Sequence, residues 1–254
     1  MEKYKLLKNG IFCLNKKENM TSSNCVEFVK KIIMRDLGWN KRFKIKVGHG
    51  GTLDYDASGV LVIGINHGCK ILTHFLHGNK SYLVSGKFGE ATDTYNKLGK
   101  VIHSSPYDHI IKDTFLCVLP NFEGNIMQIP PPYCALKING KRMSDLIREG
   151  KTVHLSARPV YCSDIQCISF DLPHFTLLIS CGAGFYVRSL VHDLGIALNS
   201  HAHVTKLCRI KQGSFILEDC LPMEHLNLEQ ILHGCYQAQS KCSANDAFGK
   251  PFRN

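Results

Sequence analysis

The stretch GHGGTLDYDASG, residues 48–59, is the feature that most constrains this chain. Four glycines, a histidine, a threonine and two aspartates, Asp54 and Asp56, come directly before GVLVIG, an apolar run typical of a buried strand. An ordinary turn is shorter and rarely combines these polar residues. The sequence therefore predicts a functional turn that leads straight into a packed strand.

Charge and size suggest the kind of partner. The 254 residues, 44% hydrophobic, are enough for one large domain or two small ones. Lys and Arg outnumber Asp and Glu by 31 to 21, a net charge of +10 that is spread along the chain. Such an excess favours nucleic acid first and a membrane surface second, although some soluble proteins are simply basic.

Targeting signals and metal motifs are weak. No apolar run reaches the roughly 18 residues of a membrane span, and charges interrupt the N-terminus, so we expect a soluble intracellular protein. The twelve cysteines include no CxxC pair, which favours free thiols in a reducing compartment. His201, His203 and Cys208 are the best metal candidates on proximity alone, and we interpret them as incidental.

Periodicity predicts alternating strands and helices. We expect strands at residues 10–16, 60–65 and 81–89 and a hairpin over 160–182. We expect helices after Asn24, capped by Asn24 and Glu27 and ended by Gly38, and over residues 68–78, 108–119 and 185–198. This mixture predicts an α+β fold with a mixed, largely antiparallel central sheet flanked by helices.

The segment 128–151 stands apart from this pattern. Prolines at its start forbid regular structure, and basic residues follow, with Met143, Leu146 and Ile147 on one helical face. It is either an ordinary surface helix after a loop or a basic flap that closes over a ligand. We place one domain over residues 1–235 and a polar tail over 236–254.

Arg188 is the clearest electrostatic signal. It falls in the first turn of a predicted helix, where a positive charge opposes the helix dipole, so we expect an anionic partner. A carboxylate beside an arginine stays anionic and suits nucleophilic attack, which makes Asp54 the candidate nucleophile. Tyr82 offers a stacking face and a phenol. The chain shows neither GxxxxGK[ST] nor GxSxG.

Five ordered segments, covering about residues 10–220, resemble the TruB-type pseudouridine synthases. GHGGTLDYDASGVLVI is similar to the family's GHxGTLDPxAxGVLxI, and KSYLVSGKFGEATDT to KxYxxxxxLGxxTDT. QIPPPYCALKINGKR resembles QxPPxYSALKxxGxR, CGAGFYVRSLVHDLG resembles CxxGxYIRSLxxDLG, and LCRIKQGSF resembles LxRTxxGxF.

The resemblance implies a reaction and its residues. A uridine in RNA becomes its C-glycoside isomer without metal or cofactor, with Asp54 as nucleophile, Tyr82 stacking on the flipped base and Arg188 pairing with Asp54. It makes segment 128–151 a thumb-like insertion that closes on RNA. The substrate-binding residues that it implies are His49, Gly51, Thr52, Lys80, Asp93, Lys137, Lys141, Arg142, Tyr186 and Leu207.

The implied partner is the T-loop of transfer RNA, at uridine 55, with messenger RNA or other structured RNA left open. We expect a monomer that binds no membrane, in cytoplasm or nucleus, with the mitochondrion open. Tyr55 and Asp56 replace the family's Pro and a small or apolar residue, and KKENMTS replaces KPxGxTS. We expect a form without the PUA domain of bacterial members, similar to the eukaryotic stand-alone relatives. A non-catalytic RNA binder or chaperone is the main alternative, a scaffold without an RNA role another, and the guide-RNA branch the least favoured.

Overall fold

The structure is a computed structural model that describes residues 6–38, 45–138, 140–150 and 155–244. The chain forms two compact units, residues 1–80 with 208–254 and residues 81–207. The first unit therefore joins both ends of the predicted catalytic domain. Each strand pair with a described register is antiparallel, and helices flank the sheet, so the predicted α+β class is confirmed.

The first unit is built around β3 (Ala57–Ile65), which carries the apolar run of the opening motif. β1 (Ile11–Lys16) pairs with it from Ile11↔Gly64 to Lys16↔Gly59, and β2 (Val47–His49) pairs with its C-terminal end. The C-terminal part of β12 (Ala202–Gln212) follows β3 in strand order and pairs with β13 (Phe215–Ile216). These strands place residues 50–56 as the connection between β2 and β3.

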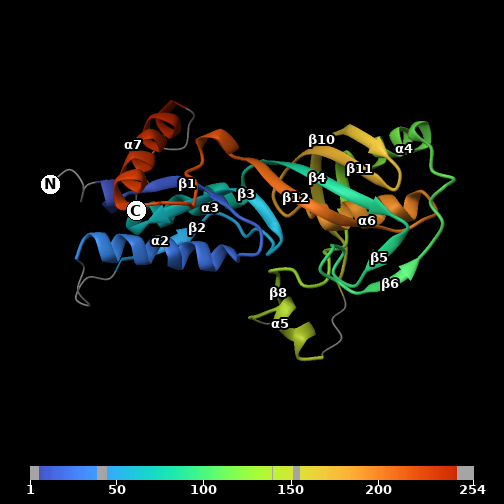
Figure 1. Ribbon diagram of the computed structural model, residues 1–254, viewed down its shortest axis with the longest axis horizontal. Helices are drawn as coiled ribbons and strands as arrows, with labels where there is room; N and C mark the ends of the chain where they lie inside the picture. Colours follow the sequence, from blue (N-terminus) through green and yellow to red (C-terminus); the bar gives the residue numbers. More distant parts are fainter. Residues whose placement is uncertain (1–5, 39–44, 139, 151–154, 245–254) are drawn as a thin grey trace. The chain divides into compact units, whose positions relative to one another are not determined.

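Helices complete the first unit. α2 (Ser22–Asp36) packs against β2, and α7 (Leu228–Ala244) packs against β1 (Figure 1). The short helices η1 (Asn66–Ile71), α3 (Leu72–His77) and η3 (Leu217–Asp219) lie in the connections. α7 buries Ala238 in the core and continues through the boundary that we placed at residue 235. Residues 245–254 of the predicted tail lie outside the described residues.

The start of α2 corrects one sequence prediction. The cap is Thr21, whose hydroxyl accepts a hydrogen bond from the Asn24 N–H at 3.0 Å, and Asn24 closes the capping box. The box that we expected from Asn24 and Glu27 is wrong, because Thr21 begins the helix three residues earlier. The predicted end is confirmed: Gly38, at φ +60°, follows the C-cap Leu37.

The second unit has the strand order β12-β4-β11-β10-β7. β4 is Lys80–Phe88, β11 His174–Cys181, β10 Arg158–Asp171 and β7 Gly124–Gln128. The hairpin β5 (Glu90–Thr92) and β6 (Val101–Ser104), the helices α4 (Lys112–Val118) and α6 (Val187–Ala197), and η2 (Leu119–Phe122) complete it. The predicted strand 81–89, hairpin 160–182 and helix 185–198 are thus confirmed.

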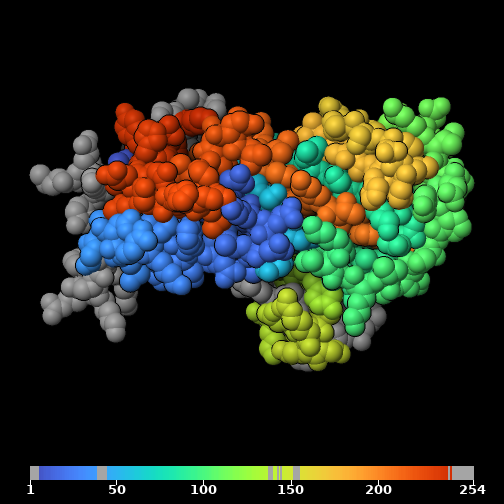
Figure 2. All heavy atoms as spheres, viewed as in Figure 1, coloured from blue at the N-terminus to red at the C-terminus, as the bar shows by residue number. Residues whose placement is uncertain are grey.

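Segment 128–151 belongs to this unit. After the prolines it forms the two-residue strands β8 (Lys137–Ile138) and β9 (Lys141–Arg142) and the helix α5 (Met143–Arg148). Their residues gather in one compact knob (Figure 2). Met143 is fully buried, whereas Asn139 and Lys151 lie outside the described residues.

The core of the second unit depends on close packing at Gly86. A Cβ on Gly86 would lie 2.3 Å from the ring of Phe175, which also packs on Phe88 at a centroid distance of 4.6 Å. Gly86→Ala is therefore expected to lower the free energy of unfolding by about 1–3 kcal/mol, measured as a lower urea midpoint. The matched control is Gly182→Ala, whose nearest neighbour would be at 3.6 Å. Equal midpoints for the two variants would contradict this packing.

None of the helices in these described ranges is long and apolar enough to cross a membrane.

Candidate active site

Asp54 lies in the turn between β2 and β3 of the first unit. The turn follows His49, the last residue of β2, whose Nδ1 accepts a hydrogen bond from the Gly51 N–H at 3.4 Å. The Gly50 N–H donates to the Val62 carbonyl at 2.8 Å, which fixes the start of the turn on β3. Gly51 has φ +147°, a conformation that favours glycine. Asp54 itself is half-buried and Thr52 is exposed.

A fully buried lysine holds the C-terminal part of this turn. The Lys16 ammonium donates to the carbonyls of Tyr55 and Ala57, at 3.4 and 2.5 Å, and to that of Lys17 at 2.9 Å. Burial lowers the pKa of Lys16, while the charges of Cys25, Asp54 and Asp56 raise it. Lys16 is therefore a counter-charge for Asp54 within the first unit, and the sequence showed it only as the first letter of KKENMTS.

Two further buried side chains hold the N-terminal part of the turn. Arg209 is 1% exposed, and it donates from Nε to the Val60 carbonyl at 2.7 Å and from Nη2 to the Gly51 carbonyl at 3.1 Å. Gln212 donates to the Gly50 carbonyl at 2.7 Å. Both residues belong to β12, which explains the polar residues of the motif LCRIKQGSF.

Ser22 fastens the middle of the turn, next to Asp54. Its hydroxyl accepts a hydrogen bond from the Leu53 N–H at 2.9 Å, and the Leu53 side chain is buried. Because backbone groups on both sides of Asp54 are fixed by buried partners, the carboxylate is presented from a stiff scaffold.

Tyr82 and Arg188 lie in the second unit. Tyr82 is on the buried face of β4 and is 8% exposed. Arg188 is in the first turn of α6, is 5% exposed, and donates from Nη1 to the carbonyls of Thr94 and Pro132 at 3.0 and 3.1 Å. These carbonyl oxygens supply part of the negative environment that we expected at this helix start. The pairing of Arg188 with Asp54, which belongs to the other unit, stays a prediction.

Three further predicted substrate-binding residues make hydrogen bonds within the protein. Lys80 donates to the carbonyls of Leu76 and Gly78 at 2.8 and 2.5 Å, at the end of α3. The Asp93 carboxylate accepts from the Lys100 N–H at 2.9 Å and closes a turn. Tyr186 precedes α6 and exchanges backbone hydrogen bonds with the Gln128 side chain at 2.8 and 3.0 Å. Burial raises the pKa of Tyr186, and the neighbouring Cys134 raises it further.

The remaining predicted residues lie on β12 and in the knob. Leu207 is buried on β12. Lys141 is exposed on β9 and pairs with Ile138, while Lys137 pairs with Arg142 in the backbone register. The side chains of Lys137 and Arg142 lie outside the described ones. The RNA contacts of all these residues stay predictions.

The metal candidates are not brought together. The His203 Nδ1 lies 3.1 Å from the Glu90 carbonyl, and His201 stacks on His103 at 5.3 Å. Among the residues described, no group of three or more His, Cys, Asp or Glu could hold a metal ion.

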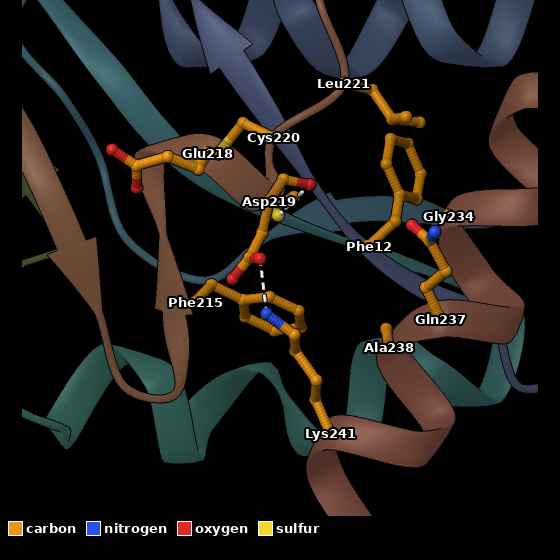
Figure 3. A pocket seen from close by; sticks show the side chains of 11 residues that line it. Phe12, Phe215, Glu218, Asp219, Cys220, Leu221, Gly234, Gln237, Ala238 and Lys241 are labelled. Carbon is orange, nitrogen blue, oxygen red and sulfur yellow. Dashed lines mark hydrogen bonds and ion pairs between the residues drawn. The ribbon is translucent and has the colours of Figure 1, made fainter.

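A cavity of about 430 Å³ in the first unit is separate from the predicted site residues. Residues of β1, β13, η3 and α7 line it, and an ion pair between Lys241 and Asp219 lies across it (Figure 3). None of the lining residues is a predicted catalytic or substrate-binding residue, so this cavity is not where we expect uridine.

Comparison with solved structures supports the fold. The chain resembles a chain in the crystal structure of a Cbf5-Nop10-Gar1 complex with a TM-score of 0.66 and 24% identity, covering 97% of this chain and 60% of that one. A second match, in an H/ACA RNP bound to a substrate RNA containing 2'-deoxyuridine, has a TM-score of 0.64 and 22% identity, covering 96% and 59%. The sheet with an aspartate in its β2–β3 turn thus has the same fold as these two chains.

Comparison of sequences gives the family. The model of the TruB family pseudouridylate synthase N-terminal domain matches residues 39–187. The Pseudouridylate synthase TRUB1 of Mus musculus is 45% identical over 232 residues (88% of this chain, 69% of that protein), and that of Homo sapiens is 42% identical over 251 residues (95% and 72%). The tRNA pseudouridine synthase B of Clostridium perfringens strain SM101 is 36% identical over 253 residues (97% and 83%). This chain therefore belongs to the TruB family, which confirms the resemblance seen in its five motifs.

Proposed function

We propose that this chain is an isomerase that converts uridine to pseudouridine in the T-loop of transfer RNA. The observation that carries the proposal is the turn of residues 50–56, which presents Asp54 in a chain of the TruB family. Its relatives include proteins named tRNA pseudouridine synthase B.

The reaction can be balanced without a cofactor. Asp54 attacks the target nucleotide and forms a covalent adduct, and the bond between C1′ and N1 of the uracil breaks. The base turns, C5 bonds to C1′ while the adduct bond to Asp54 breaks and frees the carboxylate, the C5 proton leaves, and N1 takes up a proton. Atoms and electrons balance within the nucleotide, so the reaction needs no oxidant or energy source.

Each of the three catalytic residues has a distinct task. Asp54 is the nucleophile, and the Arg188 guanidinium is a second counter-charge, in addition to Lys16, that keeps it ionised in a closed site. Tyr82 stacks on the base, which must leave the RNA stack before its glycosidic bond can break, and takes part in removing the C5 proton. The burial of Tyr82 and Arg188 supports a site from which water is largely excluded.

RNA binding falls to the basic residues and the thumb. The T-loop is recognised by its folded shape and splayed bases, and the net charge of +10 supports phosphate contacts. We propose that the knob of β8, β9 and α5 closes on the RNA. Messenger RNA and other structured RNAs are further candidate substrates. We further propose a monomer that acts in the cytoplasm or nucleus, with the mitochondrion as an open alternative.

The test uses T-loop transcripts with tritium at C5 of the uridines. Formation of the C1′–C5 bond releases this tritium to water, so the wild-type protein should release it stoichiometrically from the target uridine. The control transcript carries cytidine at that position and should release none from it. Tight RNA binding without release would instead identify a non-catalytic RNA binder or chaperone, and failure to bind at low salt would favour a scaffold.

Replacement of Lys141 and Arg142 by alanine should weaken transfer RNA binding. For every RNA phosphate that is no longer neutralised, the slope of log affinity against log salt should fall by about 0.7–0.9. The measurement is a filter-binding titration at several salt concentrations. Lys112→Ala, an exposed lysine of α4 that the resemblance leaves out of the RNA site, is the control. An unchanged slope in the double variant would remove both residues from the interface.

A further inference from the structure

Two loops of the second unit supply backbone acceptors that hold the Arg188 guanidinium. Its Nη1 donates to the carbonyl of Thr94 at 3.0 Å and to that of Pro132 at 3.1 Å. The position of a buried guanidinium is tied to the positions of its acceptors, because breaking either hydrogen bond leaves a buried polar group unsatisfied. The position of the arginine therefore depends on how firmly each loop is held.

The loop that ends at Pro132 is stiff for local reasons. Pro130, Pro131 and Pro132 fix their own φ angles. The Ser189 hydroxyl, on the residue after Arg188, donates to the Ile129 carbonyl at 2.7 Å. This acceptor is thus held by its own sequence and by α6.

The loop that carries Thr94 is held by its neighbour Tyr95. The Tyr95 ring stacks on the ring of His192, with centroids 3.8 Å apart and planes 8° from parallel. His192 is one turn after Arg188 on α6, so the stack and the guanidinium are fixed to the same helix. The Tyr95 carbonyl accepts a hydrogen bond from the Val204 N–H at 3.0 Å, which fastens the loop to β12 as well.

Both members of the stack are held at a cost. Tyr95 has φ +61°, a left-handed conformation that is rare for a bulky residue. The His192 Nδ1 is buried and has no hydrogen-bond partner among the described residues. Burial, then the charges of His201 and His103, lower the pKa of His192 to about 4, so the stacked ring is neutral near pH 7. Such costs persist only where the surroundings impose them, which points to a function for this contact.

We propose that Tyr95, stacked on His192, is a positioning residue for Arg188: the stack holds the Thr94 carbonyl against the guanidinium and so orients the counter-charge of the reaction. This inference rests on the proposed function. Neither Tyr95 nor His192 needs to touch the RNA.

The test separates the ring from the backbone conformation. Tyr95→Phe keeps the ring and should have a kcat within about twofold of the wild type. Tyr95→Asn keeps a residue that tolerates positive φ but removes the ring, and should lower kcat for tritium release by at least about tenfold, with KM and thermal midpoint nearly unchanged. Equal kcat values for Tyr95→Asn and the wild type would overturn the inference.

The partner ring gives an independent pair of variants. His192→Phe should keep the stack and most of kcat, whereas His192→Ala should lower kcat by the same factor as Tyr95→Asn. The double variant, Tyr95→Asn with His192→Ala, should lower kcat no further than either single variant. Additive losses would show that the two rings act separately and would overturn the inference. Failure of the proposed function looks different, because the wild type would then release no tritium. If Tyr95→Asn does not fold, the His192 pair decides.

Discussion

Arg188→Ala should lower the single-turnover rate of pseudouridine formation on the order of 10²–10³-fold, with a much smaller loss of transfer RNA affinity. Arg188 is 5% exposed and its guanidinium donates to two backbone carbonyls, so water cannot easily replace it. If it is the counter-charge of Asp54, its removal acts on the transition state more than on binding. The rate is measured by tritium release with enzyme in excess, and affinity by filter binding.

Two further variants make this result specific. Arg188→Lys keeps the positive charge but loses the planar donors that reach both carbonyls, so it should restore only part of the rate. Arg35→Ala removes an exposed arginine of the first unit that pairs with Asp36 and should behave as the wild type. Near-normal turnover in folded Arg188→Ala would show that the pairing with Asp54 is wrong.

Asp54→Asn should have the larger effect, a loss on the order of 10⁴-fold or more, because an amide cannot act as the nucleophile. The substitution keeps the shape of the side chain, and the turn keeps its anchors on Lys16, Ser22 and Arg209. Transfer RNA affinity and the thermal midpoint should therefore change little, which isolates the chemical step.

The matched control for Asp54 lies in the same turn. Asp56→Asn changes a second carboxylate, two residues away, which we interpret as a turn residue, and it should keep turnover within about tenfold of the wild type. The comparison tells which of the two aspartates is the nucleophile. Retained activity in Asp54→Asn together with an inactive Asp56→Asn would reverse the assignment.

Secondary structure and buried faces were predicted well wherever the pattern in the sequence is local. Alternation of apolar residues gave the buried face of β4, with Tyr82 on it, and helical spacing gave the buried side of α6. The start of α2 was predicted wrongly, because TSSN offers four capping residues in a row and the local sequence does not select Thr21. The prolines of segment 128–151 correctly marked where regular structure stops.

The supports of the candidate site could not be predicted in this way. Lys16 donates a hydrogen bond to Ala57, 41 positions away in the sequence, and Arg209 donates one to Gly51, 158 positions away. A lysine or arginine in a sequence normally predicts a solvated surface, and nothing local marks these two as buried. The stack of Tyr95 on His192 is equally non-local, and the positive φ of Tyr95 leaves no sequence signal of the kind that glycine gives.

The most direct test is chemical mapping of pseudouridine, base by base, in one transfer RNA transcript after a single turnover. Complete conversion of the T-loop uridine by the wild type, with none by an Asp54→Asn protein that binds the transcript equally well, is the predicted result. Conversion by the asparagine variant, or an unmodified T-loop under saturating wild-type protein, would contradict the account.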